Sequence, residues 1–389
     1  MTRIDGHILT PRGFLAGRIE LAANGRVAAI TGTPVEASRA RESKRPLVLP
    51  GFIDLHVHGG GGHDVMDGSD AARRIAAMHA RHGTTALLAT TLTAPTRELE
   101  RALRAVAPLC ARRPPGTARV LGVHLEGPYI NPGKLGAQPD FARTLDLAEL
   151  KSLDAIAPIR LITLAPEMPG HMEAITLLRD QGFRIQIGHT LGTYEQGVEA
   201  LERGATGFTH LFNAMTGMHR RMPGMAGAAL AHAEYSEIIP DLLHVHPGAI
   251  RVALRAIPRL FCVTDASSAA GMPDGEYRLG AHRVTKCLGG VRLADGTLAG
   301  SALTLDQALR NLVDTLGLAL DEASMRVSTH AADYLGLTDR GRLEPGAWAD
   351  AVVLDRDLEL QDVYVEGEHL PFNDNNEEEE RCRTVPSRS

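Results

Sequence analysis

Titratable side chains recur where apolar, strand-like segments of this sequence end. The candidate metal ligands are His56, His58, Glu126, His189 and His210, and Asp265 ends a later segment in the same way. Imidazole nitrogens and a carboxylate are the ligands that zinc or ferrous iron takes in proteins, and a catalytic site leaves one position for water. A lone histidine at a strand end more often has a structural role. Five candidate ligands and an aspartate together favour a metal site.

The spacing of these residues also matters. His56 and His58 are two residues apart, so in a strand they share a face and can point into the same space. His124 shares that parity with Glu126, but we interpret it as a packing residue or as a support for the ligands. The glycines at 59–62 are turn residues, or they let the backbone approach a ligand closely.

The elements that must carry these residues alternate between strand-like runs and helical patterns. The candidate strands are 51–58, 84–90, 119–126, 160–165, 183–189, 207–212, 236–245 and 260–265. They are almost continuously apolar, as expected when both faces of a parallel sheet are covered. Eight such units predict an α/β fold, a (β/α)8 TIM-type barrel, whose active site forms at the carboxyl ends of the strands.

The two ends of the chain have a different texture, with short apolar runs between turn residues. We expect residues 1–48 and 338–372 to form an accessory β-sandwich domain, and residues 49–337 to form the barrel. Within the barrel, the glycine-rich stretch 267–300 predicts an inserted region of hairpins. The polar tail 373–389 is expected to be disordered and is given no function.

The composition excludes several classes of protein. Of 389 residues, 44% are hydrophobic, and 41 basic against 47 acidic residues give a formal net charge of −6 with no basic stripe, so nucleic-acid binding is not expected. No apolar run approaches the ~18 residues of a membrane span, and the first residues do not resemble a secretory signal. The four cysteines form no CxxC pair. We therefore expect a cytoplasmic protein without a nucleic-acid or membrane partner.

Several motifs resemble one family in the order in which they occur. Residues 50–59 read Pro-Gly-Phe-Ile-Asp-Leu-His-Val-His-Gly, which resembles the opening barrel strand of the amidohydrolase superfamily. His-Leu-Glu-Gly-Pro at 124–128 and His-Leu-Phe-Asn-Ala-Met at 210–215 are similar to the N-acetylglucosamine-6-phosphate deacetylase family. The resemblance spans about residues 48–335 and implies hydrolysis of N-acetyl-D-glucosamine 6-phosphate to D-glucosamine 6-phosphate and acetate. It would place the chain in amino-sugar catabolism and cell-wall sugar recycling.

The resemblance also implies roles for individual residues. Glu126, His189 and His210 match the principal metal ligands of the family, and His56 with His58 matches a second metal site. Asp265 matches the catalytic aspartate. Positions that contact substrate in the family correspond to Ala137, Gln138, Asn213, Ala214, Arg221, His244, Leu298, Ala299 and Gly300. Gln138 stands where several members carry a sugar-binding histidine, although glutamine also occurs there.

The implied cofactor is a divalent metal, one or two ions per subunit, with zinc or iron favoured and cobalt or manganese also suited to these ligands. The implied partners are a phosphorylated amino sugar and a second copy of the chain in a homodimer. A metal held by Glu126, His189 and His210 would activate water, and Asp265 would act as general base and then general acid. Arg221 would anchor the phosphate, unless it is a solvated loop residue. His244 would bind substrate or stabilise the oxyanion.

Three alternatives stay open at this point. One is a deacetylase for N-acetylgalactosamine 6-phosphate, which differs in the configuration of one hydroxyl group. Another is a dihydroorotase-like or aminoacylase-type amidohydrolase, but dihydroorotase-like members carry a bridging lysine on the fourth strand, and residues 161–167 contain none. The third is an inactive barrel that serves as a scaffold. Such a protein typically loses ligands or the aspartate, and this chain retains them.

Overall fold

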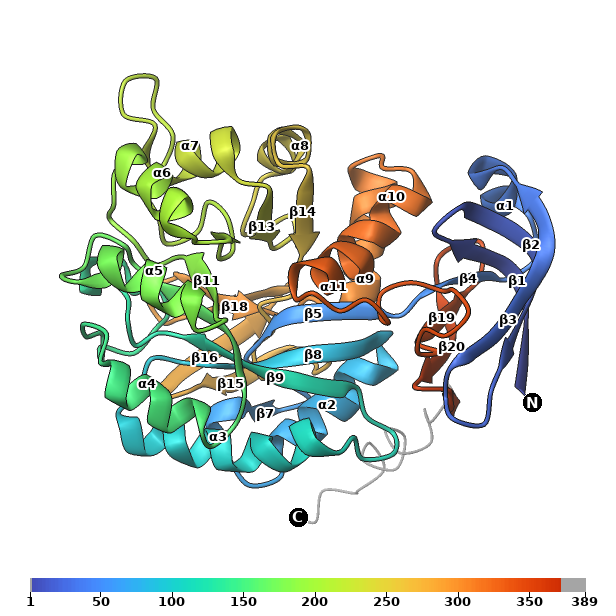
Figure 1. Cartoon of the computed structure of the whole chain (residues 1–389), viewed down its shortest axis with the longest axis horizontal. Coiled ribbons are helices and arrows are strands. Elements are labelled where there is room, and N and C mark those ends of the chain that lie inside the picture. The colour runs from blue at the N-terminus through green and yellow to red at the C-terminus, as the bar shows by residue number, and fades with distance from the viewer. Residues whose placement is uncertain (1, 372–389) are drawn as a thin grey trace, which may run out of the picture.

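The structure is a computed structural model that describes residues 2–371. A barrel and a separate sheet lie side by side, and strands from both ends of the described range belong to that sheet (Figure 1). The predicted tail 373–389 lies outside the described residues. No helix among residues 2–371 is both long and apolar enough to cross a membrane. Cys110, Cys262 and Cys287 are free thiols, whereas Cys382 is outside the described range.

Parallel strands form the barrel. They are β5 (Phe52–Val57), β8 (Thr84–Thr91), β9 (Arg119–Glu126), β10 (Ile159–Leu164), β11 (Arg184–Ile187) and β12 (Gly207–Phe208) in one sheet, and β13 (Tyr235–Ile238) with β14 (Arg259–Cys262) in a second. The Leu211 amide donates to Glu237 O at 2.9 Å, and the Asp265 amide donates to His56 O at 2.9 Å. These bonds join the two sheets at both edges, so the described residues contain the predicted (β/α)8 barrel.

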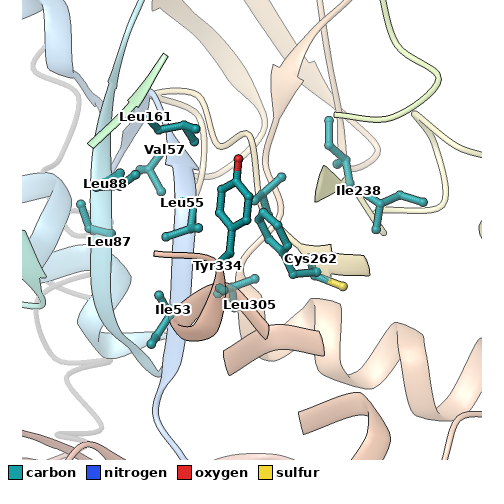
Figure 2. Close-up of a cluster of buried hydrophobic side chains, with 14 of the residues drawn as sticks. Ile53, Leu55, Val57, Leu87, Leu88, Leu161, Ile238, Cys262, Leu305 and Tyr334 are labelled. Atoms are coloured by element: carbon teal, nitrogen blue, oxygen red, sulfur yellow. The ribbon is translucent and has the colours of Figure 1, made fainter. Parts of the chain in front are cut away.

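Alternation along β5 separates the core from the site. Ile53, Leu55 and Val57 are buried. Figure 2 shows them among apolar side chains from neighbouring strands and from helices that follow the last barrel strand in the sequence. Because successive strand residues point to opposite faces, Asp54 and His56 face the other way, into the barrel. Packing of the apolar set therefore fixes where the polar set points.

Helices cover the outside of the barrel. The α-helices are α2 (Ala71–Arg81), α3 (Thr96–Ala111), α4 (Leu147–Asp154), α5 (His171–Asp180), α6 (Tyr194–Arg203), α7 (Gly224–His232), α8 (Pro247–Ala256), α9 (Leu305–Arg310), α10 (Leu320–Ser324) and α11 (His330–Tyr334). Short 3₁₀ turns are η1 (Val65–Asp67) and η2 (Pro132–Lys134), and π-helical turns are η3 (Asn311–Thr315) and η4 (Met325–Thr329). Helix α6 begins with a capping box between Thr193 and Gln196, which satisfies free amides at its start.

The accessory domain is one curled sheet in which both ends of the chain take part. Its order is β21 (Glu368–Pro371), β20 (Leu360–Val365), β19 (Ala351–Leu354), β4 (Leu47–Pro50), β1 (Thr2–Thr10), β2 (Gly13–Leu21) and β3 (Val27–Val35), with α1 (Ala37–Glu42) beside it. Buried Ile8, Ile19, Val48 and Val353 belong to a single apolar cluster. The sheet-rich domain expected from the two ends is present, but its strands are hydrogen-bonded into one continuous sheet, because β4 pairs with both β1 and β19.

The seventh barrel strand is shorter than expected, and two groups of short strands follow β5 and β14. The seventh strand, predicted over 236–245, ends at Ile238, because Pro240 has no amide to donate to a neighbouring strand. Short strands β6 (Gly59–Gly60) and β7 (His63–Asp64) follow β5. Four antiparallel strands occupy the glycine-rich stretch: β15 (Gly275–Leu279), β16 (His282–Cys287), β17 (Gly290–Arg292) and β18 (Leu298–Ser301).

Candidate active site

Glu126 ends β9 and lies at the centre of a histidine cluster. Its Oε1 atom is 3.1 Å from His189 Nε2 and 3.0 Å from His210 Nε2, and these two nitrogens are 3.1 Å apart. All three side chains are buried. Three donor atoms from β9 and from the segments after β11 and β12 therefore meet within the space of one metal ion.

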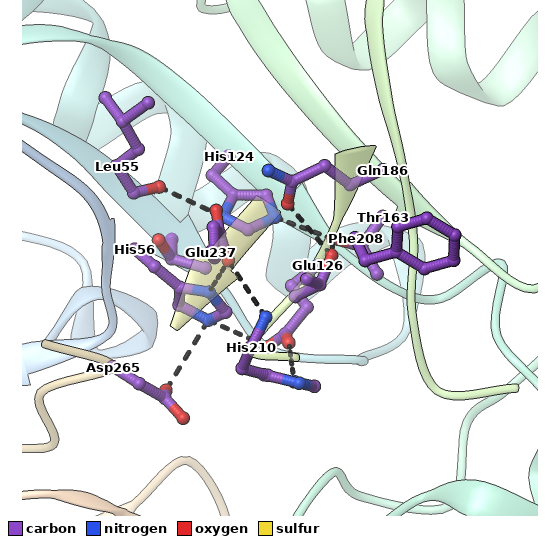
Figure 3. Close-up of polar contacts among 12 residues, drawn as sticks. Leu55, His56, His124, Glu126, Thr163, Gln186, Phe208, His210, Glu237 and Asp265 are labelled. Carbon is purple, nitrogen blue, oxygen red and sulfur yellow. Dashed lines mark hydrogen bonds and ion pairs between the residues drawn. The ribbon is translucent and has the colours of Figure 1, made fainter. Parts of the chain in front are cut away.

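The other carboxylate oxygen of Glu126 faces a second pair of histidines. Oε2 is 3.0 Å from His58 Nε2 and 3.4 Å from His56 Nε2. Asp265 Oδ1 lies 3.3 Å from His58 Nε2 and 3.5 Å from His56 Nε2. Figure 3 shows the side chains of Glu126 and His56, from β9 and β5, converging with His210 and Asp265, which follow β12 and β14. The carboxylate of Glu126 thus joins two groups of candidate ligands.

The chemistry of these donors fits a divalent cation. His189 Nδ1 donates to Lys134 O at 2.8 Å, and His56 Nδ1 donates to Glu237 Oε2 at 3.1 Å. In their neutral forms both rings then turn a lone pair toward the carboxylate of Glu126, and facing lone pairs need a cation between them. The clustered residues therefore meet the ligand requirements of zinc, iron, cobalt or manganese.

The two central carboxyl groups are anions. Burial would raise the pKa of Glu126, but a positive charge beside it (that of His56 when protonated, or that of a bound cation when the ring is neutral) and hydrogen bonds with His189 and His210 hold it well below its usual range. Burial would likewise raise the pKa of Asp265, yet His56 and His58 lower it. An ionised carboxylate is the form that binds metal and the form that accepts a proton.

Backbone conformation at the strand ends is unusual at several of these residues. His189 has φ +48°, His210 has φ +30° and Asp265 has φ +51°, a region that side chains other than glycine rarely adopt. Phe212 and Ala214, just after His210, share it. Strained backbone of this kind concentrates at functional sites, and here it turns the side chains inward from the ends of the strands.

Glu237 orients two of the candidate ligands, and His124 is a buried polar residue beside them. Glu237, on β13, is fully buried, and its Oε2 accepts from His56 Nδ1 and from the His210 amide. His124 Nδ1 donates to Leu55 O at 3.1 Å and His124 Nε2 accepts from Thr163 at 2.7 Å, so both its nitrogens are used within the protein. The role of Glu237 was missed from the sequence, where the only signal was an acidic residue within the expected strand 236–245.

His244 is held by another residue that sequence reasoning missed. His244 Nδ1 donates to Asp241 Oδ2 at 2.6 Å, and the backbone amides of Leu243 and His244 donate to Asp241 Oδ1. Burial would lower the pKa of His244, but the hydrogen bond and charge of Asp241 raise it. The Nε2 atom remains the nitrogen available to a ligand.

A cavity of about 380 Å³ opens over the cluster. Of the residues expected at the site, its lining includes His58, Glu126, Ala137, Gln138, His189, His210, Asn213, Ala214, His244, Asp265, Leu298 and Gly300. His56 and Ala299 are buried behind this surface. Gln138 donates to Glu126 Oε2. Leu92, Lys134 and Leu279 also line the cavity and were not expected there.

Arg221 is the exception among the expected site residues. It is exposed on a turn bridged between His219 and Met222, outside the lining of the cavity. Arg221 therefore lies apart from the other expected site residues, and its role as a phosphate anchor stays a prediction.

Comparison with known proteins agrees with this arrangement. The amidohydrolase family model matches residues 47–370. N-acetylgalactosamine-6-phosphate deacetylase from Escherichia coli O157:H7 is 41% identical over 94% of this chain and 98% of its own length. N-acetylglucosamine-6-phosphate deacetylase from Lysinibacillus sphaericus is 40% identical over 84% of this chain and 86% of its own.

The fold is likewise similar to solved structures. One is a mutant of N-acetyl-D-glucosamine-6-phosphate deacetylase from Mycobacterium smegmatis in complex with N-acetyl-D-glucosamine-6-phosphate. It is 34% identical, with a TM-score of 0.86 over 95% of this chain and 98% of that one. The deacetylase of the same name from Thermotoga maritima is 31% identical, also with a TM-score of 0.86, over 95% of this chain and 99% of that one.

Proposed function

Because the chain belongs to the amidohydrolase family, we propose that it hydrolyses the acetamide of N-acetyl-D-glucosamine 6-phosphate to D-glucosamine 6-phosphate and acetate. The reaction is metal-dependent and belongs to amino-sugar metabolism. The observation that carries the proposal is the carboxylate of Glu126, which faces one histidine pair with each oxygen beneath a cavity lined by Asp265. An inactive scaffold would have no need of this convergence.

The protein's own residues have distinct tasks in this reaction. Glu126, His189 and His210 would hold one ion, and His56 and His58 would hold a second. A bound divalent metal supplies Lewis acidity, which polarises a carbonyl and makes water acidic near neutral pH. Zinc and iron are both suited to a set of imidazole and carboxylate ligands.

Asp265 transfers the proton. Its carboxylate, anionic and only slightly exposed, accepts a proton from the attacking water and returns it to the nitrogen of the breaking amide bond. The water oxygen leaves with the acetyl group as acetate, and the protonated nitrogen leaves as the amine of the sugar. His244 Nε2 and Asn213, both at the cavity, bind and orient the substrate.

Phosphate recognition by Arg221 involves a second copy of the chain. Because Arg221 is exposed and outside the cavity of its own chain, the proposal requires a homodimer in which Arg221 of one copy reaches the phosphate bound in the other. A guanidinium group suits this task, since its planar fork matches phosphate oxygens. A cytoplasmic location is also part of the proposal.

An amine-release assay with N-acetylglucosamine 6-phosphate, run with and without a chelator, tests the function. We expect hydrolysis that the chelator abolishes and added zinc or iron restores. Hydrolysis that continues after treatment with the chelator would overturn the metal dependence. Absence of hydrolysis by metal-loaded protein would overturn the proposed activity.

The galactosamine epimer is the second candidate, because one relative of 41% identity carries that name. The two substrates differ in the configuration of a single hydroxyl group, so the same assay with both sugars separates the candidates. The proposal expects the higher kcat/KM with N-acetylglucosamine 6-phosphate. A higher value with N-acetylgalactosamine 6-phosphate would assign the chain to the epimer.

A further inference from the structure

Gln138 has its amide fixed at both ends. The Thr93 backbone amide donates to Gln138 Oε1 at 2.7 Å, and Gln138 Nε2 donates to Glu126 Oε2 at 2.5 Å. A backbone N–H can only donate, so the amide oxygen must face Thr93 and the amino group must face Glu126. The residue is 6% exposed, so water does not compete freely for these bonds.

The oxygen that Gln138 contacts is the one that faces the second histidine pair. Glu126 Oε2 lies 3.0 Å from His58 Nε2, whereas Oε1 lies against His189 and His210. A carboxylate that bridges two ligand groups must keep one orientation about its Cγ–Cδ bond. The N–H of Gln138 fixes that rotation, because turning the carboxylate would break the hydrogen bond.

The loop that carries Gln138 also orients His189. Lys134 O accepts from His189 Nδ1 at 2.8 Å, and the Asn131 amide donates to His189 O at 3.0 Å. The backbone amide of Gln138 in turn donates to Leu135 O, and this bond forms a turn within the loop. One short segment therefore holds two of the three residues in the Glu126 group.

We propose that Gln138 is a positioning residue for Glu126, and that it thereby sets the affinity of the site for its metal. The inference rests on the proposed metal-dependent function. Both the amide oxygen and one N–H of Gln138 are committed to protein partners. Partners that orient metal ligands in this way typically account for 10–100-fold in metal affinity.

The test measures metal affinity separately from substrate affinity in the full-length protein. Gln138→Met keeps the volume of the side chain and removes both hydrogen bonds. Apoprotein of each variant is titrated with Co²⁺ and followed by visible absorption and calorimetry, and KM is measured at saturating metal. We expect the Kd for Co²⁺ to rise about 10–100-fold and KM to change little.

A matched control is Gln186→Met, which alters a buried glutamine on β11 whose Oε1 accepts from Thr209. It should leave the Co²⁺ affinity near that of the unaltered protein. If Gln138→Met does not fold, judged by circular dichroism, Gln138→Leu removes the same N–H and takes its place.

The outcomes separate this inference from the proposed function. A large rise in KM for Gln138→Met with unchanged Co²⁺ affinity would overturn the positioning role and make Gln138 a sugar contact. An equal loss of Co²⁺ affinity in Gln186→Met would also overturn it, because the loss would not be specific to Gln138. Failure of the unaltered protein to bind Co²⁺ would instead overturn the metal-dependent function itself.

Discussion

His56 Nδ1 lies 3.1 Å from Glu237 Oε2, and neither side chain is exposed to solvent. Such an acceptor fixes the ring and directs the other nitrogen, Nε2, toward the cluster. Glu237→Met removes the acceptor, so we expect affinity for the second metal ion to fall about 10–100-fold. Calorimetric titration of apoprotein measures this loss. Glu237→Gln keeps an acceptor oxygen and should recover much of the affinity, and equal losses in both variants would contradict the assignment.

Replacing Asp265, the proposed proton carrier, should reduce kcat strongly and leave the protein folded. Asp265→Asn cannot accept a proton, and general acid–base groups contribute about 10²–10⁴-fold, so kcat should fall by that amount. Binding of an ion by Glu126, His189 and His210 should persist, because Asp265 does not belong to that group. Steady-state kinetics and metal analysis of the same preparation check both parts. Near-normal kcat would show that another residue transfers the proton.

The pH dependence of substrate binding should report the pair of His244 and Asp241. Burial alone would lower the pKa of His244, but Asp241 raises it by more. The pKa of His244 in the folded protein is therefore raised, and the ring stays protonated to higher pH. If protonated His244 binds substrate, affinity is present at low pH and is lost as pH rises through the raised pKa. Asp241→Asn should move that loss to lower pH. A KM–pH profile identical to that of the unaltered protein would argue against this role.

Subunit mixing can test the phosphate contact. Arg221→Ala should raise KM for the phosphorylated sugar, with little effect on unphosphorylated N-acetylglucosamine, if a second copy supplies the arginine. At a substrate concentration far below the raised KM, each variant alone should be nearly inactive. Co-expressed Arg221→Ala and Asp265→Asn chains should then regain about a quarter of normal activity, since symmetric dimers mix statistically. An inactive mixture that contains verified heterodimers would show that Arg221 acts within its own chain.

Much of the site was predictable because it follows local rules. His56 and His58 share one strand face by alternation, and the barrel brings its strand ends together at one mouth. The cluster of Glu126, His189 and His210 follows from that geometry once the strands are recognised.

The remaining features depend on contacts between distant segments. Glu237 meets His56 across 181 positions of sequence, and no pattern near either residue predicts the pair. Gln138 matched a position of substrate contact in the resemblance, yet its partners in the structure are Thr93 and Glu126. Sequence also could not show that Arg221 lies outside the cavity, since this depends on the path of an exposed loop.

The central claim is that Glu126, His189 and His210 share one ion. Crystals of metal-loaded protein measured at the zinc or iron absorption edge would test it most directly, because anomalous scattering locates the metal itself. We predict a peak about 2.0–2.2 Å from Glu126 Oε1, His189 Nε2 and His210 Nε2. Metal-loaded, active protein with no anomalous peak among these three residues would contradict the claim.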